Sequence, residues 1–401
     1  MRYLRFSLLF ILSTNVVFAE QEYLSPIKEQ NFDLLKNKND VENLKLGSSW
    51  IEPIELSASK IFNNQYGSNQ KNTLYKISIN QPIFKSGGII FLIKYANSKE
   101  KFDNLSVKEQ RRALIKQAVS LLFQIRRAEF QKNRQKLVLK NARIDLLRKR
   151  EQYDSGLLDS GFLDNAVIAK NSSALSLLDI ESSKNNLIES FEAISDLPLE
   201  NAKLPVLKSF TKKEYFDESI EIEKAKVNIL QSNQYKNVII AKYLPTIRVS
   251  ASYNDFKNEN FAFGNGINFS SADTYYQYGF SASWKFLDIN ILRDIESSKL
   301  DYLRAKNSQI DLKNTLEKRY AKILNNIKVV DAKLKLTYED KDLYEKLLSD
   351  TKELFKAGQK SIYDVQTLEN SFEIQKFNLK ILSIDKQLLL LDLYEKSERE
   401  L

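Results

Sequence analysis

The fold is decided by the stretch Ile77-Ser-Ile-Asn-Gln-Pro-Ile-Phe84, which precedes a long run of helical character that ends at Tyr153-Asp-Ser-Gly156. A second stretch repeats this plan, because Phe280-Ser-Ala-Ser-Trp-Lys-Phe286 precedes another such run, which ends at Phe355-Lys-Ala-Gly358. The two stretches start 203 residues apart, and the two glycines lie 202 residues apart. The sequence therefore predicts a duplicated unit of about 200 residues that joins short strands to very long helices.

The first residues have the pattern of a secretory signal peptide. Arg2 and Arg5 precede an apolar core from Phe6 to Val17, and Ala19 supplies a small residue at the cleavage point. The apolar stretch is too short to span about 30 Å of hydrocarbon, so a membrane anchor is the weaker interpretation. We expect residues 1–19 to be removed on export.

The composition excludes several classes of site. The chain contains no Cys and no His, which rules out disulfides, Cys or His metal sites and Ser-His-Asp catalysis. We therefore expect no cofactor and no metal. The net charge of +9 becomes +7 without Arg2 and Arg5, but the Lys residues alternate with Glu and Asp along helices. This pattern indicates solvated helices and no nucleic-acid partner.

The first repeat is expected to cover residues 20–196. Its long helix has no Gly or Pro from residue 89 onward and would be about 98 Å long if unbroken. A single globular core of ordinary size does not need such a rod. The predicted elements are a short charged helix over 25–46, strands over about 50–60 and 74–84 around a polar linker at 63–72, the long helix over about 89–153, and a return helix over about 163–195.

A linker over residues 197–215 joins this unit to the second repeat, 216–401. Ile323, Ile327, Val330 and Leu334 show the spacing of three and four residues that packs helices in coiled-coil fashion. The predicted elements are a helix over 216–243, strands over about 246–253 and 275–286 around a long polar loop, a long helix over about 290–356, and a return helix over about 362–398.

The strands suit a membrane barrel better than a soluble sheet. Each is expected to hold about 9 to 12 residues, which is the length that a tilted strand needs to cross a bilayer. The alternation of apolar and polar residues along these strands would by itself also fit a soluble sheet. Aromatic residues rim the strands, as in membrane barrels: Trp50, Tyr75, Phe84, Tyr253, Tyr275, Tyr276, Tyr278, Trp284 and Phe286. Because four strands cannot close a barrel, several copies must share one.

The order of these elements resembles the TolC family of outer-membrane efflux proteins. The resemblance covers Glu20 to Leu401 and rests on four segments together with their duplicated spacing. The segments are Gln81-Pro-Ile-Phe84, Tyr243-Leu-Pro-Thr-Ile-Arg-Val-Ser-Ala-Ser-Tyr253, Trp284-Lys-Phe-Leu287 and Leu354-Phe-Lys-Ala-Gly-Gln-Lys-Ser-Ile-Tyr-Asp-Val365.

The resemblance implies a mainly α fold with a transmembrane β-barrel portion. It implies a homotrimer in which a twelve-stranded barrel, embedded in outer-membrane lipid, continues into a periplasmic α-helical barrel. The protein would then be the exit duct of a tripartite efflux or type I secretion system in a Gram-negative bacterium. Its partners would be a periplasmic adaptor protein and an inner-membrane pump. No sequence motif identifies the transported substrate.

The same resemblance implies a gate at the periplasmic hairpin tips, where Gly156 and Gly358 form the turns. Lys360 and Asp364 match the basic residue and the first acidic ring of the family. Asp164 matches the acidic partner of the basic residue, although it stands eight positions after Gly156 whereas Asp364 stands six after Gly358.

Two further positions depart from the family pattern. Thr367 stands where a second Asp is often found, and Phe355 stands where a gating Tyr would offer a hydroxyl. The simpler alternative for the tip residues Lys360, Asp364 and Asp164 is solvation and capping of helix ends.

Two other functions remain as alternatives. A non-channel periplasmic coiled-coil scaffold or adaptor protein would explain the rods, but it would leave the two strand pairs unexplained. A hydrolase lacks support, because the sequence contains no nucleophile motif and no Gly-rich loop that would form a cleft. We therefore predict that the protein is not an enzyme.

Overall fold

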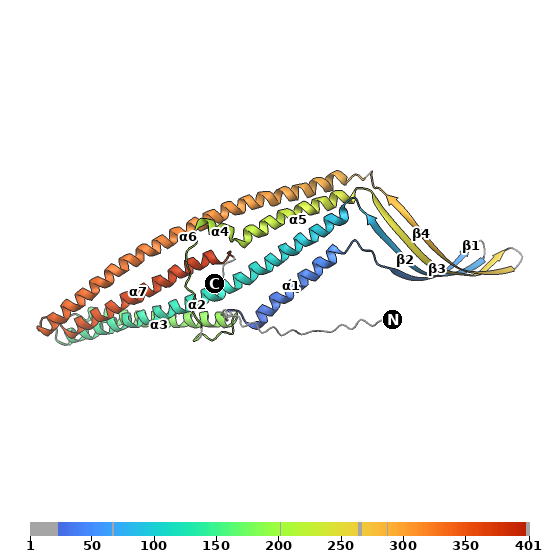
Figure 1. Cartoon of the computed structure of the whole chain (residues 1–401). Coiled ribbons are helices and arrows are strands. Elements are labelled where there is room, and N and C mark those ends of the chain that lie inside the picture. The colour runs from blue at the N-terminus through green and yellow to red at the C-terminus, as the bar shows by residue number, and fades with distance from the viewer. Residues whose placement is uncertain (1–22, 66–67, 201, 264–266, 287, 398–401) are drawn as a thin grey trace, which may run out of the picture.

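The computed structural model describes residues 23–65, 68–200, 202–263, 267–286 and 288–397, so the predicted signal peptide lies outside the described residues. The chain is long and narrow, with a sheet at one end and two helical hairpin tips at the other (Figure 1). The elements are α1 (Pro26–Gly47), β1 (Glu55–Gln65), β2 (Ser68–Phe84), α2 (Gly88–Asp154), α3 (Ser160–Glu192), α4 (Lys212–Asp217), α5 (Ile220–Lys242), β3 (Thr246–Phe263), β4 (Ile267–Ser283), α6 (Ile291–Lys356) and α7 (Ile362–Tyr394).

The strands form one antiparallel sheet in the order β1-β2-β3-β4, and three of them are longer than the sequence predicted. They contain 11, 17, 18 and 17 residues. The described parts of the expected polar linker, residues 63–65 and 68–72, are paired strand, since Asn63 lies opposite Gln70, and most of the described part of the expected loop between β3 and β4 is paired as well. The prediction was wrong here because ladder hydrogen bonds between neighbouring strands outweigh the weak strand propensity of Asn, Ser and Lys.

The two faces of the sheet differ in polarity. Residues that pair directly across an antiparallel sheet point to the same face. One face carries the row Leu56, Ile77, Tyr253 and Tyr276, and Tyr278 and Phe280 continue it along β4 with exposed fractions of 80% and 79%. The opposite face carries the row Glu55, Ser78, Ser252 and Gln277. The sheet therefore presents an uncovered apolar face and a polar face.

The two long helices end where the sequence places a turn glycine. Helix α2 contains 67 residues and α6 contains 66, so each is about 100 Å long. The sequence predicted them over about 89–153 and 290–356. Gly156 and Gly358 adopt φ values of 72° and 74°, a left-handed conformation that favours glycine. None of the described helices is long and apolar enough to cross a membrane.

The expected helix over 216–243 is two helices. α4 ends at Asp217 and α5 begins at Ile220, because the hydroxyl of Ser219 accepts a hydrogen bond from the backbone N–H of Ile222 and caps a new helix start. α4 begins inside the segment that the sequence assigned to the linker. The break turns the chain from the middle of the molecule toward the sheet (Figure 1).

The helices form a layer with two borders. α2 packs against α1, α3, α5 and α7, and α6 packs against α5 and α7. The order across the layer is therefore α1-α2-α5-α6 near the sheet and α3-α2-α7-α6 near the tips. This order leaves α1 and α3 at one border and α6 at the other.

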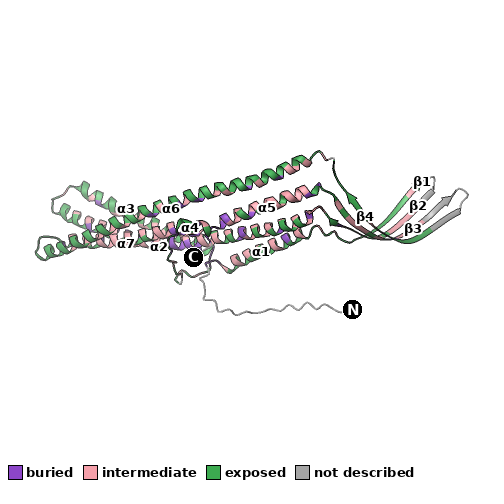
Figure 2. Ribbon diagram, turned by 45° about the horizontal axis from the view of Figure 1, so that its top comes forward, coloured by how far each residue is buried: buried purple, intermediate pink, exposed green. Residues whose placement is uncertain are grey.

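The hydrophobic core lies where the return helices α3 and α7 end and where α1 and α5 begin, a level we call the waist (Figure 2). Its large and deeply buried side chains include Phe123, Phe191, Tyr215, Leu391 and Leu393, none more than 1% exposed. The two repeats have the same backbone joint at this level. The N–H of Ser25 donates to the carbonyl of Ile194 at 3.0 Å, and the N–H of Ile220 donates to the carbonyl of Lys396 at 2.9 Å.

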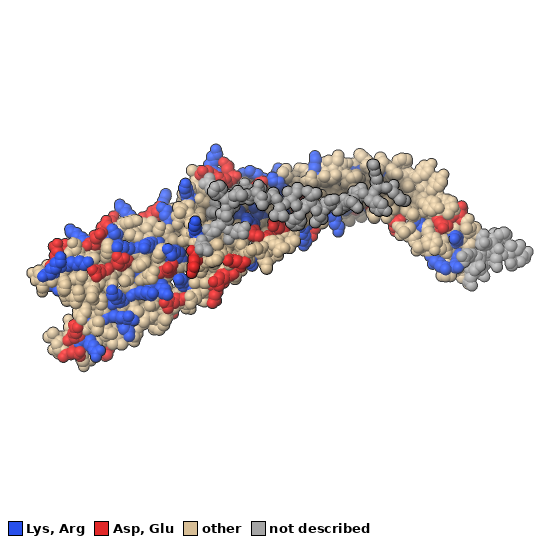
Figure 3. Space-filling view, turned by 60° about the horizontal axis from the view of Figure 1, so that its bottom comes forward, with Lys and Arg blue, Asp and Glu red and all other residues tan. Residues whose placement is uncertain are grey.

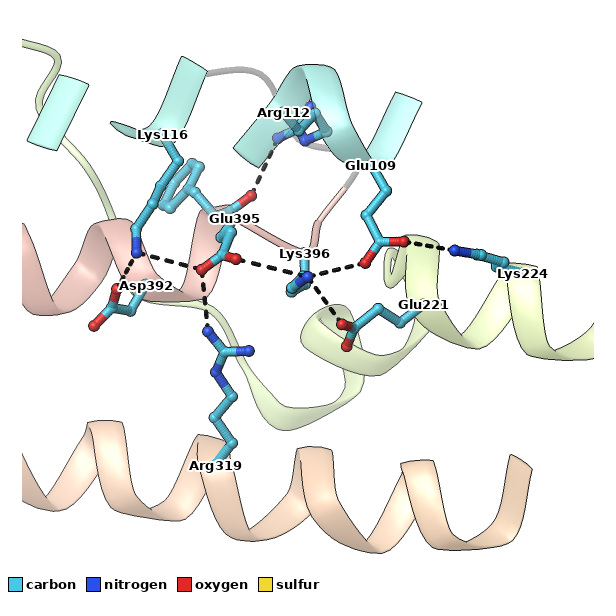
Figure 4. A network of polar contacts seen from close by, with 10 residues as sticks. Glu109, Arg112, Lys116, Glu221, Lys224, Arg319, Asp392, Glu395 and Lys396 are labelled. Carbon is cyan, nitrogen blue, oxygen red and sulfur yellow. Dashed lines mark hydrogen bonds and ion pairs between the residues drawn. The ribbon is translucent and has the colours of Figure 1, made fainter. Parts of the chain in front are cut away.

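A network of charged side chains fixes the end of α7 at the waist (Figure 4). The Lys396 ammonium contacts Glu109 of α2 at 2.9 Å and Glu221 of α5 at 3.0 Å. Glu395 accepts from Arg319 of α6 at 3.1 Å and contacts Lys116 of α2 at 3.3 Å. The last turn of α7 is thus bound to three other helices.

Burial and charge oppose each other in this network. Burial alone would lower the pKa of Lys396, but hydrogen bonds and charge interactions with Glu109 and Glu221 outweigh it and raise the pKa. For Glu109, burial would raise the pKa, and the neighbouring Lys396 and Lys224 lower it instead. Both groups are therefore charged in the folded protein, and each depends on the other.

We predict that Lys396→Met lowers the free energy of unfolding by about 3 kcal/mol, because it leaves the largely buried Glu109 and Glu221 carboxylates without their common cation. The matched control is Lys386→Met, which breaks the exposed 2.7 Å pair with Asp331 and should cost at most about 1 kcal/mol. Denaturant titration of the purified protein, followed by circular dichroism, measures both. Equal effects of the two substitutions would contradict the conclusion that the Lys396 network fixes the end of α7.

Candidate functional site

The candidate site lies at the two hairpin tips, and the two turns have the same geometry. At the first tip, the N–H of Gly156 donates to the carbonyl of Tyr153, and the N–H of Leu157 donates to the carbonyl of Gln152. At the second tip, the N–H of Gly358 donates to the carbonyl of Phe355, and the N–H of Gln359 donates to the carbonyl of Leu354. This is the Schellman motif, in which a left-handed glycine ends a helix. The structure therefore places both predicted turn glycines at the tips.

A capping box begins α7 at the second tip. The Ser361 hydroxyl accepts from the backbone N–H of Asp364 at 3.2 Å, and the Asp364 carboxylate accepts from the N–H of Ser361 at 3.1 Å and from its hydroxyl at 2.8 Å. The hydrogen bonds from Ser361, helped by the charges of Lys360 and Arg148, lower the pKa of Asp364. The alternative role foreseen for Asp364, helix capping, is thus present in the single chain.

Two contacts that the sequence analysis missed join the tips to each other. The Tyr363 hydroxyl of α7 donates to the Glu151 carboxylate of α2 at 2.6 Å, and the Arg148 guanidinium of α2 donates to Asp364 at 3.5 Å. The hydrogen bond to Glu151 raises the pKa of Tyr363. A tyrosine hydroxyl therefore does cross between the hairpins, but it comes from Tyr363 because Phe355 has none.

The structure does not bring the other predicted tip residues together within one chain. Lys360 and Asp164 are exposed, and in the part of the chain that the structure describes no hydrogen bond or ion pair joins them. The difference in spacing after the two glycines is not an insertion, because the caps Asp159 and Ser361 each stand three residues after their glycine. The position equivalent to Asp364 is therefore occupied by Phe162.

Thr367 lies in the contact between α2 and α7. Its carbonyl accepts from the Ser371 hydroxyl at 2.8 Å and from the Asn141 amide at 3.4 Å. The side-chain oxygen Oδ1 of Asn141 in turn accepts from the side-chain amide of Asn370 at 2.7 Å, and Asn370 is only 4% exposed. The position expected to carry an acidic ring thus belongs to a neutral polar region.

Four polar pairs, which we call the polar ladder, recur at regular spacing along the contact between α2 and α7. Each step of seven residues along α2 is matched by a step of seven residues back along α7. The pairs are Arg127 with Asp385 at 2.6 Å, Arg134 with Asn378 at 3.3 Å, Asn141 with Ser371 at 3.4 Å, and Arg148 with Asp364 at 3.5 Å. The heptad spacing of Arg127, Arg134 and Arg148 was the signal in the sequence that could have revealed it.

No family model matches the chain, and a search of curated proteins also finds no match. Solved structures do match. The Campylobacter jejuni outer membrane channel CmeC is 15% identical with a TM-score of 0.72, covering 94% of this chain and 85% of CmeC. The Vibrio cholerae outer membrane protein VceC is 14% identical with a TM-score of 0.71, covering 92% and 93%. The open state of the Neisseria gonorrhoeae channel MtrE is 13% identical with a TM-score of 0.60, covering 92% and 85%.

These similarities show the fold. The chain has the architecture of the outer membrane channels over more than nine-tenths of its length. The mainly α fold with strands at one end, which the resemblance to the TolC family predicted, is confirmed.

We predict that Ser361→Ala frays the start of α7 at the tip. Losing an N-cap side chain costs about 1 kcal/mol, so amide hydrogen exchange over residues 361–365 should become about fivefold faster. Because the folded-state pKa of Asp364 is lowered, the contribution of its carboxylate is present at neutral pH and is lost as the pH falls through that lowered value. Hydrogen-exchange mass spectrometry provides the measurement.

Ser155→Ala is the matched control at the other tip. The Ser155 hydroxyl donates to the carbonyl of Glu151 at 2.6 Å and caps no backbone N–H, so its loss should leave exchange unchanged. If both serines protect their tips equally, the capping box is not what orders the start of α7.

Proposed function

We propose that this protein is an outer membrane channel of a Gram-negative bacterium. It would be the exit duct of a tripartite efflux or type I secretion system, and it would receive substrates from an inner-membrane pump through a periplasmic adaptor protein. The observation that carries the proposal is the four-stranded sheet, which has an uncovered apolar face and ends in helices of about 100 Å. We assign the protein no catalytic role and no cofactor.

The apolar face of the sheet fits contact with lipid. Charged side chains gather over the helices, and few appear on the visible face where the helices meet the strands (Figure 3). The three longer strands have 17 or 18 residues, whereas about 9–11 suffice to cross a bilayer. The excess length would carry the polar ends near Asn63 and Asn72 beyond the lipid on the outer side.

The two edges of the sheet require other copies of the chain. β1 and β4 each have one neighbour, and an unpaired strand edge in lipid would leave several backbone groups without hydrogen bonds. Because the smallest membrane barrels need about eight strands, we propose a homotrimer with twelve. The borders of the helical layer also carry exposed apolar side chains, among them Ile27, Leu34, Val41, Ile168, Leu175, Leu303 and Ile310.

We propose that Lys360, Asp364 and Asp164 act at the periplasmic gate. Since Lys360 and Asp164 are not joined in the described chain, their link would form between neighbouring copies. Three copies of Asp364 would attract cations at the aperture, and Thr367 would leave the gate less acidic than a second acidic ring would. Phe355 offers no hydroxyl there, so Tyr363 and Glu151 supply the hydrogen bond between the hairpins.

We predict that Phe280→Lys blocks assembly in the outer membrane. A lysine on the lipid face of a barrel costs about 2–4 kcal/mol near the middle of the bilayer. Gln277→Lys is the matched control, because Gln277 lies on the polar face of the same strand, opposite the uncharged Ser252. Fractionation and detergent extraction of both variants provide the measurement. If both variants stay in the membrane fraction, or if the unaltered protein purifies without detergent, the channel proposal is wrong.

We predict that Lys360→Ser raises the conductance of the channel and that Asp364→Asn lowers its preference for cations. Asn at position 364 can still cap the helix, so this variant removes charge without removing the cap. Single-channel recordings in planar bilayers measure both quantities. Unchanged conductance and unchanged ion selectivity in the two variants would contradict the gate assignment.

A further inference from the structure

The polar face of the sheet carries a small group of apolar and aromatic side chains toward the end away from the helices. Every second residue of each strand lies on this face, and most of these residues are Ser, Asn, Gln or charged. Before the bulge that follows Asn258, and apart from Pro82, each strand contributes one exception: Ile61 of β1, Leu74 of β2, Phe256 of β3 and Tyr275 of β4. In the register of the sheet, neighbours among these four are offset by no more than two residues.

A carboxylate lies beside the two aromatic members of this group. Asp273 of β4 pairs directly with Phe256 of β3, and Tyr275 follows two residues later on the same strand and the same face. The Cβ atoms of directly paired residues are about 5 Å apart, and alternate residues of a strand are about 7 Å apart. Phe256, Asp273 and Tyr275, which we call the β3/β4 triad, are therefore close enough to contact one small molecule together.

The triad borders a buried asparagine on a face that is otherwise open. Asn254 is only 3% exposed, and its side-chain amide donates to the Ser252 hydroxyl at 3.1 Å. Its neighbours on this face are Tyr275 and Lys76, which pair with it, and Phe256, two residues further along β3. Because the described chain places no other element over this face, these side chains must lie across Asn254 to bury it. The two rings therefore lie along the sheet and form a floor beside the carboxylate.

The Asp273 carboxylate is available to a ligand. Its residue is exposed, and no hydrogen bond or ion pair engages it within the part of the chain that the structure describes. The cation–π contacts of the described residues all involve rings other than Phe256 and Tyr275. Lys76, the cation of this face nearest to the triad in the register, is separated from Tyr275 by Asn254. The triad thus offers a negative charge and two aromatic rings.

This combination suits an organic cation that carries an aromatic ring. The faces of Phe and Tyr rings attract positive charge, and aromatic cages are a known means of binding quaternary ammonium groups. The adjacent carboxylate adds an attraction that a neutral molecule lacks and that an anion opposes. Leu74, which pairs with Phe256 on its other side, extends the apolar surface for the rest of such a molecule. A hydrated metal ion would gain little from these apolar neighbours.

The triad lies near the outer limit of the lipid-facing band. On the opposite face of the sheet, the row of Lys60, Thr73 and Lys257 crosses the strands next to the row of Phe256, so the apolar band ends at this level. Resting on the channel proposed above, we infer that the β3/β4 triad binds aromatic organic cations near the outer mouth of the channel, and that such cations are among its substrates. Because the carboxylate is exposed to water, binding is weak enough for the cation to leave again.

Binding of ethidium, a permanently charged aromatic cation, tests this inference. Fluorescence anisotropy of ethidium, titrated with the purified protein in a non-ionic detergent, gives the dissociation constant. Asp273→Asn and Phe256→Leu should each weaken binding at least about threefold, because each removes one attraction for the cation. Asp273→Glu and Tyr275→Phe keep the charge and the ring and should bind as the unaltered protein does. The matched control is Asp255→Asn, which removes a carboxylate from the opposite face and should change nothing.

Competition separates the contribution of the ring from that of the charge. Benzyltrimethylammonium should displace ethidium at a several-fold lower concentration than tetramethylammonium, which has the same charge and no ring, and benzenesulfonate should not displace it. Asp364→Asn should leave the binding unchanged, because the hairpin tips lie at the other end of the molecule (Figure 1). The inference is overturned if the unaltered protein shows no saturable binding, if Asp273→Asn binds as tightly, or if the three competitors act equally.

This experiment needs no ion flow, so the site and the channel can fail separately. Circular dichroism of each variant shows whether the fold is retained, and binding by Asp273→Glu shows that a change at this position is tolerated. Absence of conductance in planar bilayers, with the expected binding pattern, would refute the channel and leave the site. A conducting protein in which Asp273→Asn and Asp255→Asn bind ethidium equally would refute the site alone.

Discussion

The whole structure depends on one constraint, which is that backbone N–H and C=O groups cannot remain unpaired in an apolar environment. The sheet has an exposed apolar face and two edge strands, β1 and β4, with one neighbour each. An edge of this kind is tolerated in water but not in lipid. In the membrane location that we propose, this sheet would need further strands from other copies, and the helices that continue from the strands would follow the same arrangement.

The two repeats share the same helical architecture but differ in how the ends of their return helices, α3 and α7, are held at the waist. Both repeats have the same turn, the same cap position and the same backbone joint at the waist. The charges, however, are placed unequally. Ion pairs of Glu395 and Lys396 join the end of α7 to three other helices. The equivalent end of the first repeat, Ile194 and Ser195, is buried and carries no charged side chain. The end of α7 is thereby fixed at the waist, and its start at the tip is held by fewer contacts.

Much of the fold could be predicted from the sequence, because its signals are local. The absence of Gly and Pro over more than 60 residues indicates a long helix, and a lone glycine after it indicates the turn. The extension of the strands into residues 63–65 and 68–72 could not be predicted, since Asn and Lys there gain strand structure only from their partners. The same holds for the break at Ser219, where one hydroxyl decides between one helix and two.

The candidate site was predictable only in part. Gly156, Gly358 and Asp364 lie at the tips as the sequence indicated, but the contacts of Tyr363 with Glu151 and of Arg148 with Asp364 join residues more than 200 positions apart. Such contacts depend on the register of α2 against α7, which the sequence pattern within either helix does not determine. The comparison of the two tips also shows that Phe162, and not Asp164, occupies the position equivalent to Asp364.

The number of chains in the assembled protein tests the central claim most directly. Native mass spectrometry of the detergent-extracted protein should give a particle of three chains. A stable single chain that needs no detergent would contradict the account, because its sheet would then keep its apolar face in water and would need no strands from other copies.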